Sequence, residues 1–405
     1  MARISRGQRL YSALNGKQPD KVPVVPKIWV DLAANLTGTD LLDVITEPAA
    51  ALGAIAEAAI LCGCDAARQF HFPRRKIEVD GEKVYELGAA GRVGEIDLQG
   101  GLATWLYDAK VFNLEDPAYM AYHHFWTANE PFVGSIGDAR RMAVPDKKIL
   151  SDFGWERRQR EAINRYGDEL ALIGDCSSAT MAFYVCMRGM NLAMFDLIEE
   201  RQLVHAVMEK GEAIAISKGK LNLDMGLKIL RLNDSVGNMT VISPEHWREF
   251  VFPHMKSVCD ELHSYDDEAR IYCHICGNVL PIAEDLVTAG IDCIGPLDPL
   301  GGMTPGQVRE RVGNAVSLMG GVNTLSFVEK TPNQIIEEAH ICIEEAGAKG
   351  GYVLGSGCVV PRSAPADNLL ALRTAADTYS RRISHPSGGV EMPGPAEDSV
   401  HQPKE

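Results

Sequence analysis

The sequence predicts an α/β fold of the (β/α)8 TIM barrel type. In its C-terminal half, five short β-rich runs alternate with helical patterns, which is typical of parallel βα units. Three more candidate strands precede these runs, and eight βα units are the number that forms a TIM barrel. The eight predicted strands are residues 22–30, 65–70, 170–174, 228–232, 270–274, 291–295, 315–319 and 352–354.

Two of the intervening helices have recognisable start signals. Ser243 is followed by Pro244, and Thr331 is followed by Pro332. A Ser or Thr side chain can cap the free N–H groups of a first helical turn, and Pro fits the first helical position because no N–H is needed there. We therefore predict that helices begin at Pro244 and at Pro332.

The second and third predicted strands lie much farther apart than one βα unit requires. We therefore predict a long insertion between them, at about residues 72–165, inside a single catalytic domain of residues 1–384. Residues 385–405 are poor in apolar side chains and are predicted to have no fixed structure. The insertion carries a group of rings that either cap a pocket or fill a small core of their own: Trp105, Tyr107, Tyr122, His123, His124, Phe125 and Trp126.

Composition excludes several classes of function. The 405 residues carry 40 Lys and Arg against 55 Asp and Glu, a net charge of −15, which argues against nucleic acid as a partner. No stretch reaches the roughly 18 apolar residues of a membrane span, and no signal peptide is apparent. The 10 Cys are scattered along the chain, which favours free thiols or metal ligands over a disulfide framework. Free thiols are typical of a reducing compartment, so we expect a cytoplasmic protein.

The end of the fifth predicted strand carries the most specific chemical signal. Residues i and i+2 of an extended chain point to the same side, so His274 and Cys276 can present a nitrogen and a sulfur to one ion. Cys273 then points to the opposite side. This pattern disfavours the alternative of a redox or zinc-ribbon pair made of Cys273 and Cys276.

Cys358 follows the eighth predicted strand and is the natural third ligand. The carboxyl ends of all barrel strands open on one face, where the loops build the active site. One His and two Cys with a fourth position left open describe a catalytic zinc site. The alternative is that the two thiols are buried core residues, which free cysteines often are.

Three further polar residues follow predicted strands. Asp175 and Asp234 come at the ends of the third and fourth strands. Each can be a zinc ligand, a catalytic acid or base, a partner of His274, or a helix cap. Asp234 is the stronger candidate because its strand adjoins that of His274 and its loop is polar. Asn323 lies in the Gly-rich loop 320–324 after the seventh strand. That loop either holds an anionic group of a cofactor with its backbone N–H groups or forms a tight turn without a ligand.

Several segments resemble the uroporphyrinogen decarboxylase superfamily, and the resemblance extends over nearly all of residues 5 to 380. The segments that carry it are residues 10–14, 19–24, 188–190, 197–198, 242–245 and 355–358. The resemblance implies a (β/α)8 barrel, in agreement with the strand count. It also implies one of two activities, because the superfamily contains both decarboxylases and methyltransferases.

The site residues resemble the methyltransferase branch. Residues 26–31 lack the arginines with which a decarboxylase binds its tetrapyrrole, whereas His274, Cys276 and Cys358 resemble the zinc motif of corrinoid-dependent methyltransferases. The resemblance implies transfer of a methyl group between a small methoxylated compound or thiol and a cobalt corrinoid. A partner protein is expected to carry the corrinoid, because the chain has no Asp-x-His-x-x-Gly signature. The alternatives are a metal-independent decarboxylase and a non-catalytic barrel subunit.

Overall fold

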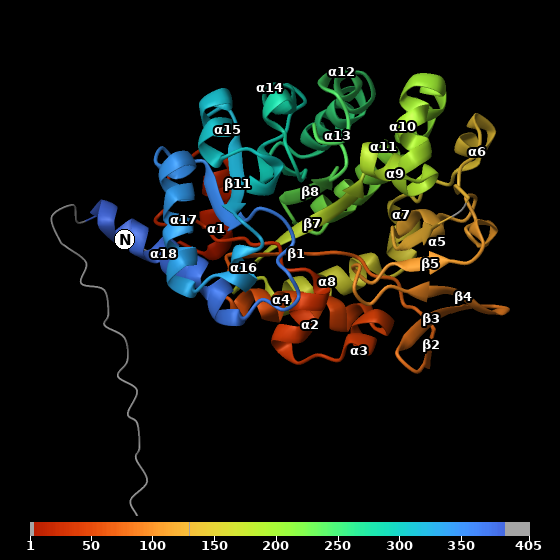
Figure 1. Ribbon diagram of the computed structural model, residues 1–405, viewed down its shortest axis with the longest axis horizontal. Coiled ribbons are helices and arrows are strands. Elements are labelled where there is room, and N and C mark those ends of the chain that lie inside the picture. Colours follow the sequence, from red (N-terminus) through yellow and green to blue (C-terminus); the bar gives the residue numbers. More distant parts are fainter. Residues whose placement is uncertain (1–3, 129, 385–405) are drawn as a thin grey trace, which may run out of the picture.

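The computed structural model describes residues 4–128 and 130–384. Its centre is a curled parallel sheet of seven strands in the order β1-β7-β8-β9-β10-β11-β12, with helices packed along its outer side (Figure 1). The predicted tail, 385–405, lies outside the described residues. The strands of this sheet are β1 (Ala66–Arg68), β7 (Ala171–Ser178), β8 (Ile229–Asn233), β9 (Arg270–His274), β10 (Cys293–Leu297), β11 (Ser317–Val322) and β12 (Tyr352–Ser356).

The first predicted strand, residues 22–30, is wrong as a regular strand. Two isolated bridges join this segment to the chain at and after β12, from Val24 to Leu354 and from Lys27 to Val359. Pro23 and Pro26 remove two backbone N–H donors, so a continuous ladder cannot form. The other seven predicted strands are present, and β10 begins two residues later than expected.

The segment nevertheless lies between the two edges of the sheet. The Val25 N–H donates to the Leu354 carbonyl at 2.8 Å, and the Asp65 N–H donates to the Val24 carbonyl at 2.8 Å. One buried cluster collects a residue from this segment and from every strand, together with three residues of helix α1: Val25, Ala66, Ile173, Ile229, Tyr272, Cys293, Met319, Val353, Leu10, Ala13 and Leu14.

Both predicted helix starts are confirmed. The Ser243 hydroxyl accepts the His246 N–H at 3.2 Å at the start of α12, and Thr331 with Gln334 forms a capping box at the start of α17. The chain passes from α12 through a π-helical turn, Trp247–Val251, into α13. The helices flanking the sheet are α1 (Arg6–Leu14), α2 (Val30–Thr37), α3 (Leu41–Thr46), α4 (Pro48–Leu61), α9 (Met181–Arg188), α10 (Met190–Glu199), α11 (Arg201–Asp224), α12 (Pro244–His246), α13 (Phe252–Tyr265), α14 (Ala283–Thr288), α15 (Pro305–Val312), α16 (Ser326–Glu329), α17 (Pro332–Gly347) and α18 (Ala366–Ser384).

Among the described residues, no single helix is long and apolar enough to cross a membrane. Helices α9 and α10 reach that composition only as a pair, across a bend of 112°.

Between β1 and β7 the chain builds a second, smaller sheet, which lies at one side of the molecule (Figure 1). The first four of its strands pair antiparallel and the last pair is parallel. Its elements are β2 (Ile77–Asp80), β3 (Lys83–Gly88), β4 (Gly91–Ile96), β5 (Thr104–Leu106), β6 (Phe125–Thr127), α5 (Pro117–Ala121), α6 (Ile136–Arg141), α7 (Lys147–Asp152) and α8 (Trp155–Tyr166).

Candidate metal centre

The structure brings the three predicted metal ligands together at the carboxyl ends of β9 and β12. The Cys276 Sγ lies 3.3 Å from the His274 Nε2 and 3.1 Å from the Cys358 Sγ, and all three ligand atoms lie within 4.8 Å of one another. Both thiols are free, so the contact is not a disulfide. Cys273 is fully buried and belongs to the hydrophobic core, on the side away from the three ligands.

Two glycines allow the loops that carry the cysteines to approach the loops after neighbouring strands. Gly277 has a φ of +74°, and a Cβ there would lie 2.6 Å from the Asn238 Oδ1. At Gly357 a Cβ would lie 2.8 Å from the Pro299 side chain. A larger residue would therefore push the loop of Cys276 away from Asn238, or the loop of Cys358 away from Pro299.

His274 is held in the form that binds a metal ion. Burial, with Lys27 and two arginines nearby, lowers the pKa of His274 well below its ordinary value, so the ring is neutral. The Tyr272 hydroxyl lies 2.9 Å from the Nδ1 and can accept a hydrogen bond from an Nδ1–H group. In that tautomer the Nε2 keeps its lone pair, on the side of Cys276.

The contact between the two thiols shifts their pKa values in opposite directions. The hydrogen bond with Cys276 lowers the pKa of Cys358, and the same contact together with burial raises the pKa of Cys276. The Lys27 Nζ lies 2.8 Å from the His274 Nε2, and burial lowers the pKa of Lys27 to about 8. A neutral imidazole and two thiols, one of them already poised as a thiolate, fit the donor set that zinc prefers.

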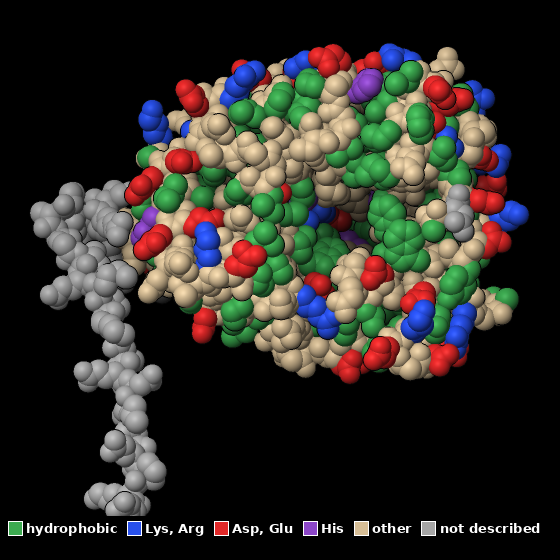
Figure 2. Space-filling model, viewed as in Figure 1, with side chains coloured by type: hydrophobic (Ala, Val, Ile, Leu, Met, Phe, Trp, Pro, Cys, Tyr) green, Lys and Arg blue, Asp and Glu red, His purple; other side chains and the backbone are tan. Residues whose placement is uncertain are grey.

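A cavity of about 620 Å³ opens beside this centre. Lys27 and Val359, which adjoin the candidate ligands, line it. Figure 2 shows the hollow near the middle of one face, with hydrophobic side chains around it and basic and histidine side chains visible inside. Its aromatic wall consists of Trp29, Phe70, Phe72, Tyr122, Trp126 and Trp155.

The rings of the insertion divide between the two roles that the sequence left open. Tyr122, His123, His124 and Trp126 line the cavity. Phe125 packs against Phe112 and Tyr119, in a core of the insertion itself. The remaining two, Trp105 and Tyr107, are 41% and 58% exposed and do not reach the cavity.

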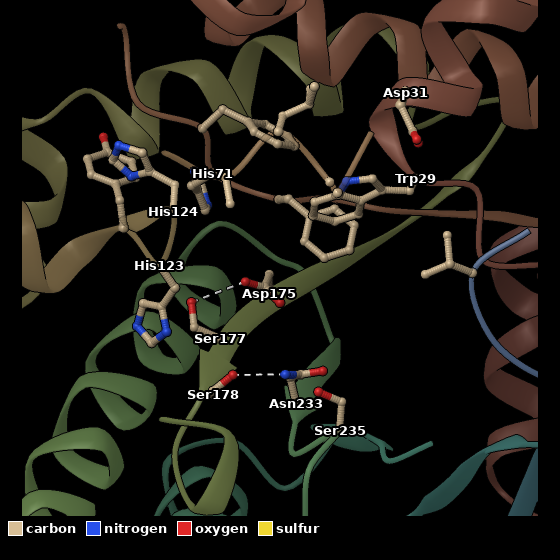
Figure 3. Close-up of a pocket in the computed structure, with 18 of the residues that line it drawn as sticks. Trp29, Asp31, His71, His123, His124, Asp175, Ser177, Ser178, Asn233 and Ser235 are labelled. Atoms are coloured by element: carbon tan, nitrogen blue, oxygen red, sulfur yellow. Dashed lines mark hydrogen bonds between the residues drawn. The ribbon is translucent and has the colours of Figure 1, made fainter. Parts of the chain in front are cut away.

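Asp175 lies in the wall of the cavity. Its Oδ1 accepts from Arg231 at 2.6 Å, and its Oδ2 accepts from the Ser177 hydroxyl at 3.2 Å (Figure 3). Arg231 stands opposite Asp175 in the pairing of β7 with β8, and it also donates to Asn233. The carboxylate is therefore held in a fixed orientation toward the cavity.

Asp234 lies beside the centre but away from the cavity. Its Oδ1 accepts the Ala182 N–H at 2.7 Å at the start of α9, and its own N–H donates to the His274 carbonyl at 2.9 Å. Burial raises the pKa of Asp234 to about 6. The side chain therefore caps a helix, which is one of the roles that the sequence left open. The capped helix is α9, which follows β7, and not the helix that follows Asp234 itself.

Asn323 lies outside the residues that line the cavity. Its N–H donates to the Glu338 Oε1 at 2.7 Å, and its Oδ1 accepts the Leu325 N–H at 3.0 Å. The Gly-rich loop therefore does hold a carboxylate, but it is a carboxylate of this chain.

Sequence reasoning missed four buried cations: Lys27, Arg68 and Arg231 near the candidate ligands, and Lys218 behind the cavity. Arg68 and Arg231 sit inside parallel strands, where both faces are covered. A charged residue within such a strand is the signal that could have found them, because unpaired charges are rarely buried.

The fold and the site define a class of protein: a parallel α/β protein with a candidate metal centre at the carboxyl ends of its strands. The family model described as uroporphyrinogen decarboxylase (URO-D) matches residues 127–379. The chain belongs to this family.

Curated relatives include both methyltransferases and decarboxylases. The methylated-thiol–coenzyme M methyltransferase of Methanosarcina mazei is 27% identical over 168 residues, which are 41% of this chain and 42% of the relative. The methylcobamide:CoM methyltransferase MtaA of Methanosarcina barkeri is 23% identical over 184 residues, 45% of this chain and 51% of the relative. The chain thus spans about half the length of these relatives. A uroporphyrinogen decarboxylase of Coxiella burnetii is 23% identical over 261 residues, 63% of this chain and 70% of the relative.

A solved structure shares the fold along most of the chain. A methyltransferase from Methanosarcina mazei superposes with a TM-score of 0.65 at 18% identity, covering 93% of this chain and 99% of that chain.

Proposed function

We propose that the protein is a zinc-dependent methyltransferase that moves a methyl group between a small substrate and a cobalt corrinoid. The observation that carries the proposal is the convergence of His274, Cys276 and Cys358 beside a cavity of about 620 Å³. The methyltransferase relatives support it, and the name of one includes methylcobamide.

The three ligands would hold zinc, which when bound supplies Lewis acidity that activates a thiol or an ether oxygen. With its proton on Nδ1, where the N–H can donate to the Tyr272 hydroxyl, His274 would offer its Nε2 lone pair to the metal. The lowered pKa of Cys358 favours its thiolate form, which is the form that binds zinc. Lys27 places a positive charge beside the ligands and offsets the negative charge of the thiolates.

The aromatic wall favours a methoxylated aromatic compound as the methyl donor. The rings that line the cavity offer flat, apolar contacts to another ring, and the cavity is larger than a methylated thiol alone needs. In that direction the corrinoid accepts the methyl group. We propose that a partner protein carries the corrinoid to the open face of the cavity.

We propose further that the curled sheet closes as a (β/α)8 barrel within one catalytic domain of residues 1–384, with the insertion as its cap. The inner cluster supports closure because it includes Val25 beside one residue from each of the seven strands. All ten cysteines are free, which suits a reducing compartment, and we place the protein in the cytoplasm.

Of the two predicted catalytic carboxylates, Asp175 has access to a substrate. Its place in the cavity wall supports a role in orienting the donor. Asp234 supports the centre from behind, since its N–H holds the His274 carbonyl. We propose no cofactor-binding role for Asn323, because its N–H already binds Glu338 and its Oδ1 already binds Leu325.

Metal content of the purified protein tests the proposal first. We expect about one zinc per chain in the wild type and little in Cys358→Ala or His274→Ala, because three ligands are needed to hold it. Cys186→Ala is the matched control, since this free thiol lines the same cavity away from the centre. The loaded wild type should demethylate methoxylated aromatic donors with free cob(I)alamin as acceptor, followed by the cobalt absorption spectrum. Equal zinc in Cys358→Ala and wild type contradicts the assignment.

A second candidate is a metal-independent decarboxylase. The Coxiella burnetii enzyme, the longest match among the three curated relatives, favours it, and the ion pair of Asp175 with Arg231 in the cavity could serve that chemistry. It predicts a zinc-free wild type that releases CO₂ from a carboxylated substrate and loses this activity in Asp175→Asn.

A further inference from the structure

A buried ammonium group lies behind the cavity on the side of the insertion. Lys218 of α11 is 1% exposed, and no carboxylate of the described residues forms an ion pair with it. Its Nζ donates to the Ser177 hydroxyl at 2.5 Å and lies 5.0 Å from the centre of the Trp155 ring. Burying a charge without an opposite charge costs stability, so its retention here calls for a further contact.

Ser177 presents a hydroxyl group to the cavity from an unusual backbone conformation. Its φ of +66° is shared by one other non-glycine among the described residues, Leu102. A left-handed serine at a cavity wall stores strain of the kind found at ligand sites. Because Lys218 occupies a lone pair, Ser177 keeps its proton for donation, to Asp175 at 3.2 Å or to a bound group.

Two neutral histidines complete this end of the cavity. The Nδ1 of His71 and both ring nitrogens of His123 are buried without a hydrogen-bond partner. Burial, and then the charge of Lys218, lowers the pKa of both rings well below the ordinary value. A neutral imidazole carries one N–H donor, so each ring has a donor to offer. Figure 3 shows His123, Ser177 and Asp175 on one side of the pocket, away from Trp29 and Asp31.

We propose that Ser177, His71 and His123, backed by the charge of Lys218, form a subsite for an oxyanion group of the substrate. The inference rests on the proposed function and deepens it: the methyl donor carries a carboxylate or a sulfonate at the end opposite its methyl group. Asp175 offsets the charge of Lys218 only in part, because it also forms an ion pair with Arg231 at 2.6 Å.

The spacing of the strands sets the distance between the proposed subsite and the metal centre. Ser178 of β7 pairs with Asn233 of β8, and Asn233 pairs with His274 of β9. Two strand spacings amount to about 10 Å, which is the scale of one substituted aromatic ring. A ring that bridges the two ends therefore places its methoxy group at the thiols while its anionic group reaches Ser177.

Calorimetric titration with benzoate, benzenesulfonate and the neutral isostere benzamide tests the subsite without methyl transfer. We expect the wild type to bind one of the two anions about tenfold more tightly than benzamide, since a charge-assisted hydrogen bond is worth that much. The preferred anion distinguishes a carboxylate site from a sulfonate site. The preference should vanish in Lys218→Met and return in Lys218→Arg. Lys220→Met, on the same helix and paired with Glu261, should keep it.

Equal affinity for the anions and benzamide in the wild type overturns the proposal, and so does an unchanged preference in Lys218→Met. If that variant binds no probe, Ser177→Ala decides, since a retained preference there overturns the proposal and a reduced one supports it. Cys358→Ala should keep the preference, and its loss there means that the anion binds at the metal centre instead. A preference in a wild type without zinc or methyl transfer leaves the subsite standing and rejects the proposed function.

Discussion

At the scale of single residues, the most informative feature is a set of buried positive charges in and behind the cavity. Lys27, Arg68, Lys218 and Arg231 are each less than 10% exposed. Among the described residues Arg231 alone of the four pairs with a carboxylate, that of Asp175. Such burial costs free energy of folding, so these residues indicate a site selected for binding over stability.

Lys218→Met should stabilise the protein at neutral pH. Burial lowers the pKa of Lys218 from 10.5 to about 8, so the unfolded chain binds more protons than the folded one between these values. The stability of the wild type relative to the variant should therefore rise from pH 8 to pH 10.5. Below pH 8 the deficit of the wild type is up to about 3 kcal/mol. Urea unfolding at pH 7 and pH 9.5 measures it, and a variant less stable than wild type at pH 7 contradicts the account.

Tyr272→Phe should weaken zinc binding by about tenfold or more, because it removes the group that orients the imidazole. The hydroxyl lies 2.9 Å from the His274 Nδ1. Competition with a chelator of known affinity measures the change. Tyr352→Phe is the control, since its hydroxyl binds the Gly320 carbonyl away from the centre. Equal losses in the two variants show a general loss of packing in place of an effect on His274.

At the scale of elements, the insertion places one of two paired tryptophans on the cavity. Trp105 of β5 and Trp126 of β6 stand opposite each other, with ring centres 6.2 Å apart. Trp126 lines the cavity, and Trp105 is 41% exposed. The two positions share strand type and neighbourhood but differ in access to a substrate.

Trp126→Ala should raise the KM for a methoxylated aromatic donor by about tenfold with a smaller effect on kcat, because ring contact binds the substrate throughout the reaction. Trp105→Ala should leave both constants close to wild type. Steady-state kinetics of the two variants with free cob(I)alamin checks the difference. Similar KM values in both variants mean that the insertion does not contact the donor.

At the scale of the whole molecule, one buried carboxylate joins the parts of the chain that meet between the two edges of the sheet. Asp65, which precedes β1, accepts from Arg9 of α1 at 2.5 Å, from Arg373 of α18 at 2.7 Å and from the Val24 N–H at 2.8 Å. It is fully buried. Asp65 therefore connects both ends of the described chain to the irregular segment beside β12.

Asp65→Ala should cost about 3 to 5 kcal/mol of folding free energy, because it leaves two arginines without their buried partner. Asp20→Ala, which removes the 42% exposed partner of Arg9, should cost less than about 1 kcal/mol. Chemical denaturation of both variants measures the difference. Equal and small losses show that the contacts between the two edges of the sheet do not depend on Asp65.

Much of the architecture was predictable because it rests on local patterns. Seven of eight strands and two helix starts follow from alternating periodicity and from Ser or Thr before Pro. The one that failed is the first, residues 22–30, where the missing N–H groups of Pro23 and Pro26 mattered more than the apolar character of the run. The two prolines were visible in the sequence, but the apolar composition of the run was given more weight.

The sequence by itself determined the alternation of strand and helix and the His274-x-Cys276 spacing, since both depend on backbone periods of a few residues. Tertiary structure alone decided that Cys358 meets Cys276 at 3.1 Å, that Lys27 joins them, and that Asp234 caps a distant helix. The physical reason is distance along the chain. Contacts between residues far apart in sequence depend on how the sheet curls and which loops its glycines bring together, and no local pattern encodes either.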